Sequence, residues 1–130
     1  MQLVHHFLIE SATRDRDGLA LRCDDQMLTY EQLDAASSGF AVELQRSGVQ
    51  RGDRVVMLLE NSAELVIAIF GTLKAGAVFV VLNPTTKAKK LAYVLDDCGA
   101  RVLVTQSALA RTVGDVESQV RSLPTVIWTY

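Results

Sequence analysis

The chain carries two histidines, His5 and His6, the residue type that most often binds transition metals in proteins. His6 and Glu10 lie four positions apart and would share one face of a helix. His5 would point about 100° away from His6 on that helix, and the segment has neither an HExxH motif nor a third ligand. We therefore expect no metal site here and interpret both histidines as polar residues on the outer side of a helix.

Two pairs of neighbouring carboxylates, Asp24-Asp25 and Asp96-Asp97, are candidates for acid–base chemistry. A catalytic pair must share a proton between facing groups, whereas adjacent residues on a helix point in different directions. The second pair is also expected in the last turn of a helix, where the helix dipole disfavours negative charge. We interpret all four residues as solvated surface.

Lys87, Lys89 and Lys90 form the densest basic cluster of the sequence. Such a cluster could bind a phosphate group or an acidic partner protein. Because no aromatic residues are interleaved with the lysines, we favour a solvated helix face.

The segment Gly71–Gly76 has the glycine spacing of a phosphate-binding P-loop but not its chemistry. A P-loop needs Lys and then Ser or Thr directly after the second glycine, and it leads from a strand into a helix. Ala77 and Val78 follow here, and the segment is expected to lead from a helix into a strand, so we interpret Gly76 as a helix end. The G-x-G-x-x-G fingerprint and the G-x-S-x-G nucleophile elbow are both absent from the sequence. The residues alone therefore nominate no catalytic, cofactor-binding or metal-binding position.

The two cysteines, Cys23 and Cys98, lie in separate segments without a CxxC motif. We expect small, buried, free thiols in a reducing compartment. The N-terminal stretch MQLVHHFLIE lacks the basic region of a signal peptide, and the longest apolar runs, such as Ala75–Leu82, are too short to span a bilayer. We accordingly expect a cytoplasmic protein without a membrane contact.

Composition restricts the size and class of the protein. The 130 residues, of 14.2 kDa, suffice for one domain over residues 1–130 and not for two. Hydrophobic residues make up 49% and charged residues 22%, which is typical of a globular protein and excludes a disordered tail. The net charge of −2 lacks the basic excess of a general nucleic-acid binder.

Hydrophobic periodicity predicts that a helix and a hairpin precede an alternation of helices and strands. The expected helices are Leu3–Thr13, 29–48 (capped by Thr29), 61–76 (capped by Asn61), Lys87–Cys98 and Gln106–Ser122. The expected strands are Leu19–Cys23, Met27–Thr29, Arg54–Leu59, Ala77–Leu82, Arg101–Thr105 and Thr125–Trp128. Arg54–Leu59 and Ala77–Leu82 are apolar without alternation, the pattern of strands buried on both faces. We predict an α/β three-layer sandwich with a mostly parallel sheet and a short antiparallel edge hairpin.

Two stretches resemble a known family. Leu28–Leu33 (LTYEQL) and Leu73–Pro84 (LKAGAVFVVLNP) resemble the first two core motifs of the enzymes that form acyl- and aminoacyl-adenylates. Between them, Gly48–Val55 looks like the family's entry to its central strand, and Leu91–Ala100 is similar to the helix that follows in acyl-CoA synthetases. The departures are Val81, where many members have Pro, and a more basic segment at residues 85–90.

The resemblance implies the N-terminal subdomain of a two-step ligase. In this family a carboxylate attacks the α-phosphate of Mg²⁺-bound ATP, which gives an acyl-adenylate and pyrophosphate. The thiol of coenzyme A, or of a phosphopantetheine on an acyl or peptidyl carrier protein, then accepts the acyl group. ATP and Mg are thus the implied cofactors of the longer enzyme, and its partners are the remainder of the ligase and the thiol acceptor. The stretches LNPTTK and LDDCGA are more similar to acyl-CoA or acyl-carrier ligases than to peptide-synthetase modules.

The family's phosphate loop, adenine shelf, ribose-binding Asp, hinge and catalytic Lys lie further along than Tyr130. The resemblance therefore assigns no catalytic, cofactor-binding or metal-binding residue to these positions, and we expect the 130 residues alone to be inactive.

Two other functions stay open. The chain could be a stand-alone, non-catalytic binding module derived from this family, with the Lys87–Lys90 face as one contact, or a homodimer formed through exposed apolar surface. An independent Rossmann-type nucleotide binder is the third reading, and the missing glycine fingerprint argues against it.

Overall fold

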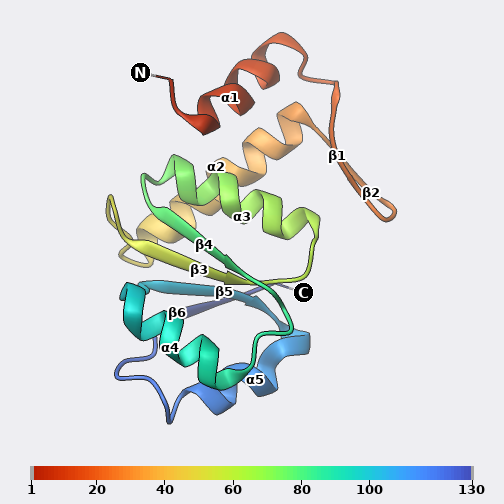
Figure 1. Cartoon of the computed structure of the whole chain (residues 1–130). Coiled ribbons are helices and arrows are strands. Elements are labelled where there is room, and N and C mark those ends of the chain that lie inside the picture. The colour runs from red at the N-terminus through yellow and green to blue at the C-terminus, as the bar shows by residue number, and fades with distance from the viewer. Residues whose placement is uncertain (1, 130) are drawn as a thin grey trace.

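The computed structural model describes residues 2–129, in which helices and strands alternate after an initial helix and hairpin (Figure 1). The helices are α1 (Val4–Arg14), α2 (Tyr30–Arg46), α3 (Ala63–Lys74), α4 (Ala88–Cys98), the 3-10 helix η1 (Ser107–Leu109) and α5 (Ala110–Val116). The strands are β1 (Leu19–Cys23), β2 (Gln26–Thr29), β3 (Arg54–Leu58), β4 (Val78–Leu82), β5 (Val102–Gln106) and β6 (Thr125–Thr129). The predicted order of elements is confirmed.

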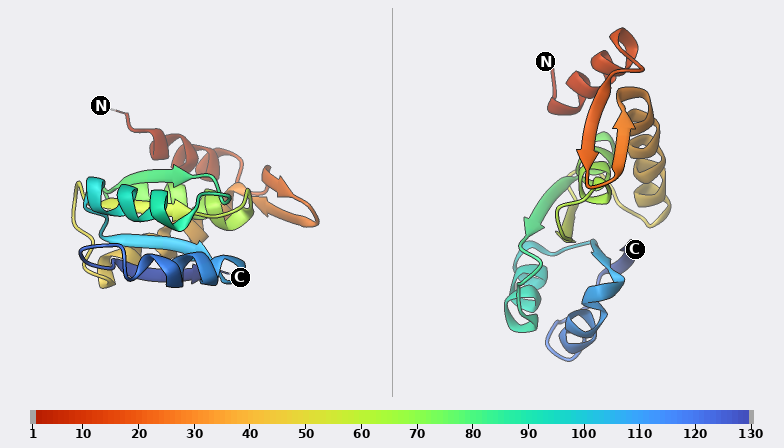
Figure 2. Two further views of the ribbon diagram at one scale, coloured as in Figure 1. Left: turned by 60° about the horizontal axis from the view of Figure 1, so that its bottom comes forward. Right: turned by 90° about the vertical axis from the view of Figure 1, so that its right-hand side faces the viewer.

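Four strands form one parallel sheet in the order β4-β3-β5-β6. Helices α2 and α3 cover one face of this sheet, α4 and α5 cover the other, and α1 lies outside α2 and α3 (Figures 1 and 2). The predicted three-layer α/β sandwich is therefore confirmed. Among residues 2–129 we find no helix with the length and apolar character that a bilayer crossing requires.

The core consists of two clusters, one on each face of the sheet. Because side chains alternate along a strand, Val55 and Met57 of β3 join the cluster under α2 and α3, whereas Val56 and Leu58 join the cluster under α4 and α5. All four side chains are fully buried, as the unalternating apolar pattern of this strand predicts.

Strand β4 has the same apolar pattern but lies at the edge of the sheet, so the prediction that it is buried on both faces is wrong. Val78, Phe79 and Val81 are 45%, 38% and 43% exposed. The physical reason is that β4 has β3 as its single neighbour among the described strands. A run of apolar residues predicts burial but does not distinguish a central strand from an edge strand.

The antiparallel hairpin of β1 and β2 is present, with Asp24 and Asp25 in its turn and a positive φ of 52° at Asp24. Its place differs from the predicted edge of the main sheet, because β1 and β2 form a separate two-stranded sheet. The hairpin contacts α2 and α3 and projects beyond the carboxyl ends of the parallel strands (Figures 1 and 2).

Two predicted boundaries are corrected. Helix α3 is capped by Ser62, whose hydroxyl accepts the Leu65 N–H at 3.2 Å, and not by Asn61. The predicted helix over Gln106–Ser122 is shortened to η1 and α5, because Gln106 continues β5 and no side chain caps either helix. Gly114 further weakens helix propensity within α5.

Thr29 caps α2 as predicted. Its hydroxyl accepts the N–H of Gln32 at 3.1 Å, and the Gln32 side chain accepts the N–H of Thr29 at 2.9 Å. This reciprocal pair satisfies two backbone donors that the first turn of a helix would otherwise leave without a partner.

Replacing Thr29 by Ala is expected to lower the free energy of unfolding by about 1 kcal/mol, because it removes the capping oxygen. The matched control is Thr29→Ser, which keeps a hydroxyl at the same position. Urea denaturation of both variants measures the difference, and equal stability of the two would contradict the capping role.

Candidate functional site

The topology of the sheet places the candidate site at the carboxyl ends of β3 and β5. From β3 the chain crosses over one face through α3 to reach β4, and from β4 it crosses over the other face through α4 to reach β5. The direction of winding therefore reverses between β3 and β5. In open α/β sheets, ligands bind in the crevice outside the carboxyl ends of the strands at such a reversal.

Two side chains of β5 fix the segment that follows β3. The hydroxyl of Thr105 donates to the Leu58 carbonyl oxygen at 2.9 Å, and the Gln106 side chain accepts the Glu60 N–H at 2.9 Å. Thr105 is fully buried and Gln106 is 9% exposed. These two polar side chains thereby hold the last residue of β3 and the start of the β3–α3 loop, because each of them satisfies a backbone group there.

The hairpin turn forms the opposite wall of a cleft of about 380 Å³ over this loop. The thiol of Cys23 donates to the Asn61 carbonyl oxygen at 3.7 Å and ties the hairpin to the loop. The cleft is lined by carboxylates from both walls, namely Asp24, Asp25, Glu60 and Glu64. Its lining therefore suits a cation or a hydrogen-bond donor better than a phosphate.

Within residues 2–129, no group of three or more His, Cys, Asp and Glu residues is arranged to hold a metal ion. The cleft contains no histidine that could activate the Cys23 thiol. The geometry supports binding and positioning at this edge.

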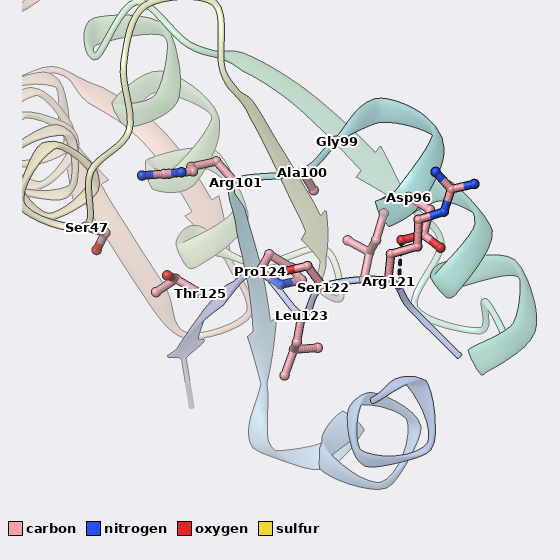
Figure 3. Close-up of a pocket in the computed structure, with 11 residues that line it drawn as sticks. Ser47, Asp96, Gly99, Ala100, Arg101, Arg121, Ser122, Leu123, Pro124 and Thr125 are labelled. Carbon is pink, nitrogen blue, oxygen red and sulfur yellow. Dashed lines mark hydrogen bonds between the residues drawn. The ribbon is translucent and has the colours of Figure 1, made fainter. Parts of the chain in front are cut away.

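A cleft at the opposite, amino-terminal edge of the sheet is lined by two arginines, Arg101 and Arg121 (Figure 3). The two side chains extend in opposite directions, Arg101 toward Ser47 and Arg121 toward α4 (Figure 3). Asp96 accepts the backbone N–H of Arg121 at 3.1 Å. Because the guanidinium groups diverge, they do not form a joint anion site.

Of the two histidines, His6 binds the backbone at the start of α1. The Nδ1 atom of His6 accepts the N–H of Leu3 at 3.0 Å, whereas Glu10 accepts a hydrogen bond from Gln2. His6 and Glu10 therefore bind different partners and do not form a ligand pair. Burial lowers the pKa of His5 from its ordinary value, and the positive charges of His6 and Lys74 lower it further.

The other candidate residues from the sequence, which are the aspartate pairs, the lysine cluster and the cysteines, lie apart from one another in the structure. Asp24 and Asp25 form the hairpin turn, and Asp96 and Asp97 lie in the last turn of α4. The three lysines at the start of α4 are exposed, which agrees with a solvated helix face. Cys23 and Cys98 are free thiols, and burial raises the pKa of Cys98, which disfavours the reactive thiolate.

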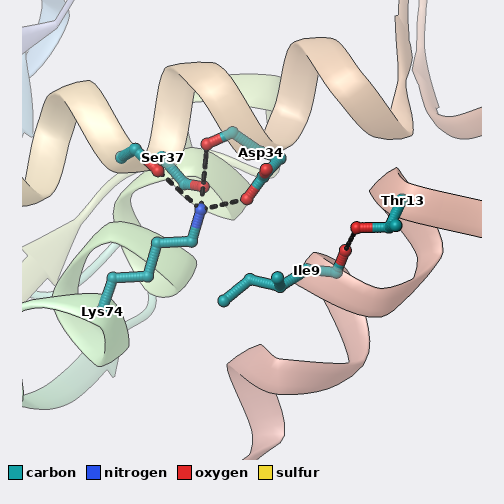
Figure 4. A network of polar contacts seen from close by, with 6 residues as sticks. Ile9, Thr13, Asp34, Ser37 and Lys74 are labelled. Atoms are coloured by element: carbon teal, nitrogen blue, oxygen red, sulfur yellow. Dashed lines mark hydrogen bonds and ion pairs between the residues drawn. The ribbon is translucent and has the colours of Figure 1, made fainter. Parts of the chain in front are cut away.

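A buried lysine, which sequence reasoning missed, joins the two motifs. The Nζ atom of Lys74, near the end of α3, contacts the Asp34 carboxylate and donates to the Asp34 carbonyl and the Ser38 hydroxyl, both at 2.9 Å (Figure 4). The Lys74 side chain is 9% exposed. Asp34 directly follows LTYEQL, and Lys74 belongs to LKAG, so the two conspicuous stretches of sequence contact each other. The available signal was that Lys74 is the one basic residue of α3, a helix rich in apolar residues.

The sequence matches the family described as AMP-binding enzyme over residues 8–129. The chain belongs to the AMP-binding enzyme family. Among its relatives, the phosphinothricin tripeptide synthetase PhsC of Streptomyces viridochromogenes is 38% identical over 107 residues, which are 82% of this chain and 10% of the synthetase.

Two solved structures share the fold of this family member. The anthranilate CoA ligase AuaEII, in complex with anthranoyl-AMP, superposes with a TM-score of 0.91 at 26% identity over 96% of this chain. The N-terminal domain of FACL13 from Mycobacterium tuberculosis gives 0.91 at 27% identity over 99%. The chain spans only 24% and 34% of these two structures and 10% of the synthetase.

In this member of the AMP-binding family, three residues in the two motif stretches stabilise or shape the fold. Thr29 caps α2, Lys74 joins α3 to α2, and Gly76 turns from α3 toward β4 with a φ of 75° that L side chains disfavour. The absence of a catalytic residue among these positions stays a prediction.

Replacing Gln106 by Leu is expected to lower the free energy of unfolding by about 1–2 kcal/mol, because the Glu60 N–H loses its acceptor in a partly buried position. The matched control is Gln119→Leu, since the Gln119 side chain makes its hydrogen bond at the exposed surface. Denaturant unfolding of the two variants measures the difference. Equal losses would show that Gln106 does not hold the loop.

Proposed function

We propose that these residues form the N-terminal part of an ATP-dependent ligase that activates a carboxylic acid as acyl-AMP and transfers it to a thiol. The observation that carries the proposal is the match of residues 8–129 to the AMP-binding family, in a fold that superposes on a ligase in complex with an acyl-adenylate. ATP and Mg²⁺ are the cofactors of the longer protein under this proposal. The chain supplies a scaffold, whose carboxyl edge holds a loop and a hairpin in fixed positions.

We take the substrate to be an amino acid and the acceptor to be a carrier-bound thiol. The reported tripeptide synthetase shares 38% of its residues with this chain over the aligned region, against 26% for the anthranilate CoA ligase. This proposal differs from the sequence-based prediction, in which the stretches LNPTTK and LDDCGA favoured acyl-CoA ligases. We place the protein in the cytoplasm, where its two free thiols would stay reduced.

The test is ATP–pyrophosphate exchange by the longest natural polypeptide that contains these residues. Panels of amino acids, aryl acids and fatty acids are supplied one at a time, and the isolated 130-residue chain is the control. We expect exchange with one or a few amino acids in the long polypeptide and none in the short chain. Exchange with aryl or fatty acids alone would overturn the substrate class, and exchange by the short chain would overturn its role as a scaffold.

A further inference from the structure

Helix α1 begins with a hydrogen bond that depends on the protonation of a histidine. Leu3 is the N-cap residue of α1, and its N–H donates to Nδ1 of His6 at 3.0 Å. Because Nδ1 is the acceptor, the neutral ring carries its proton on Nε2, and a second proton would bind at Nδ1. Protonation of His6 therefore removes the acceptor and directs two N–H groups at each other.

Helix α2 begins with the same contact, but the side chain that makes it does not titrate. Gln32 is the third residue of α2, as His6 is of α1, and its side chain accepts the N–H of the N-cap residue Thr29 at 2.9 Å. Glutamine and glutamate are the usual residues at this position of a capping box. The chain thus contains two versions of one contact, and the version in α1 responds to pH where histidine titrates.

His5 adds to the positive charge that acid would bring to this end of α1. The ring centroids of His5 and His6 lie 4.7 Å apart. Two protonated rings would therefore place two like charges at the positive end of the helix dipole. The charged side chains beside α1 on the helices packed against it are Lys74 of α3 and Asp34 of α2, which are paired with each other (Figure 4).

The direction of the pH effect at His5 follows from its surroundings. Burial, His6 and Lys74 lower the pKa of His5 below its ordinary value of 6.5. The folded chain therefore binds this proton less tightly than the chain with α1 undocked. The packing of α1 is at full strength above pH 6.5 and weakens as the pH falls below that value.

Few contacts hold α1 in place. Leu8 is the one buried residue among its 11, whereas Val4 and Phe7 are 64% and 59% exposed. A helix of this length is unstable in water unless it packs against other elements. A modest loss at its first turn is therefore sufficient to shift α1 from the packed state to the undocked state.

We propose that α1 is a pH-sensitive element, which packs against α2 and α3 at neutral pH and is released in mild acid when His6 and His5 bind protons. Ile9 of α1 extends toward the Lys74 ammonium group (Figure 4), and the Lys74 side chain is 9% exposed. Release of α1 therefore opens the ion pair between Lys74 and Asp34 to water.

Amide hydrogen exchange of the chain, followed by NMR, tests this proposal. The protection factors of the Leu8 and Ile9 amides are expected to fall at least about 10-fold from about pH 7.5 to about pH 5, through the lost hydrogen bond and the helix dipole. The amides of Leu91 and Leu95 in α4, a helix without histidine, are expected to keep theirs. Unchanged protection in α1, or an equal fall in α4, would overturn the proposal.

The matched control is the double variant His5→Gln/His6→Gln. Glutamine at position 6 keeps an acceptor for the Leu3 N–H but binds no proton in this pH range. The α1 amides of this variant are expected to have the same protection factors at both pH values. A fall as large as in the parent chain would show that the proton acts at a carboxylate, such as Glu10 of α1 or Asp34 of α2, and the proposal would be wrong.

An NMR titration of the parent chain checks the hydrogen bond itself. The ring carbon shifts of His6 report its protonation, and the amide proton shift of Leu3 reports the loss of its acceptor. Both are expected to change with one common midpoint. A Leu3 amide shift that stays constant while the His6 ring titrates would contradict the proposed role of this contact.

Discussion

Gly71→Ala is expected to lower the free energy of unfolding by about 2–3 kcal/mol, through overpacking between α2 and α3. A Cβ atom at this position would lie 2.7 Å from Cδ2 and 2.9 Å from Cβ of Phe40, and 2.9 Å from the carbonyl oxygen of Ser37. The oxygen and the Phe40 Cβ are fixed by the helix backbone, so neither can move away without shifting α2. Glycine at this point lets the two helices approach each other closely.

The control for this prediction is Gly39→Ala, in which the glycine also lies within a helix. Apart from the adjoining backbone of α2 itself, no heavy atom lies within 4 Å of a Cβ built at Gly39. Alanine there is expected to raise the free energy of unfolding by about 0.5–1 kcal/mol, because it restricts the unfolded chain and favours the helix. Urea denaturation of both variants gives the comparison. Stabilisation by both substitutions would mean that α2 and α3 do not approach at Gly71.

Lys74→Met is expected to lower the free energy of unfolding by about 2–3 kcal/mol, since it removes the partner of a partly buried carboxylate. The lysine side chain is 9% exposed and that of Asp34 is 32% exposed, so water compensates Asp34 only in part. Methionine keeps the length and the helix propensity of the residue. The loss therefore reports on the ammonium group and its three hydrogen bonds.

The matched control is the second ion pair of the described chain, between Arg16 and Glu31 at 3.0 Å. Its side chains are 66% and 51% exposed, and solvent screens such a pair strongly. Arg16→Met is expected to leave the denaturation midpoint unchanged within error. A double-mutant cycle with Asp34→Asn isolates the pairwise energy of Lys74 and Asp34, and additive losses in that cycle would contradict their coupling.

The elements that sequence reasoning predicted well are those with local signals. Thr29, with Gln32 three residues later, is a capping pattern, and Gly76 and Gly99 end helices with positive φ angles. The burial of Val55–Leu58 in β3 followed from the unbroken apolar run of these residues. Each of these features depends on residues near one another in the sequence, so it could be predicted without knowledge of the tertiary structure.

The features that were missed depend on residues far apart in the sequence. Lys74 and Asp34 are separated by 40 positions, and neither indicates its partner. The hydrogen bond between Gln106 and Glu60 spans 46 positions and is what fixes the candidate site. The exposure of β4 was mispredicted because it depends on the order of the strands, which an apolar run does not encode.

The measurement that tests the central claim most directly is the size of the native polypeptide that contains these residues. An antibody against the chain, combined with mass spectrometry of the captured protein, gives that size in extracts of the source. We expect a species several times heavier than 14.2 kDa that carries amino-acid-dependent ATP–pyrophosphate exchange. A species of 14.2 kDa alone, without exchange activity, would contradict the account and favour a stand-alone binding module.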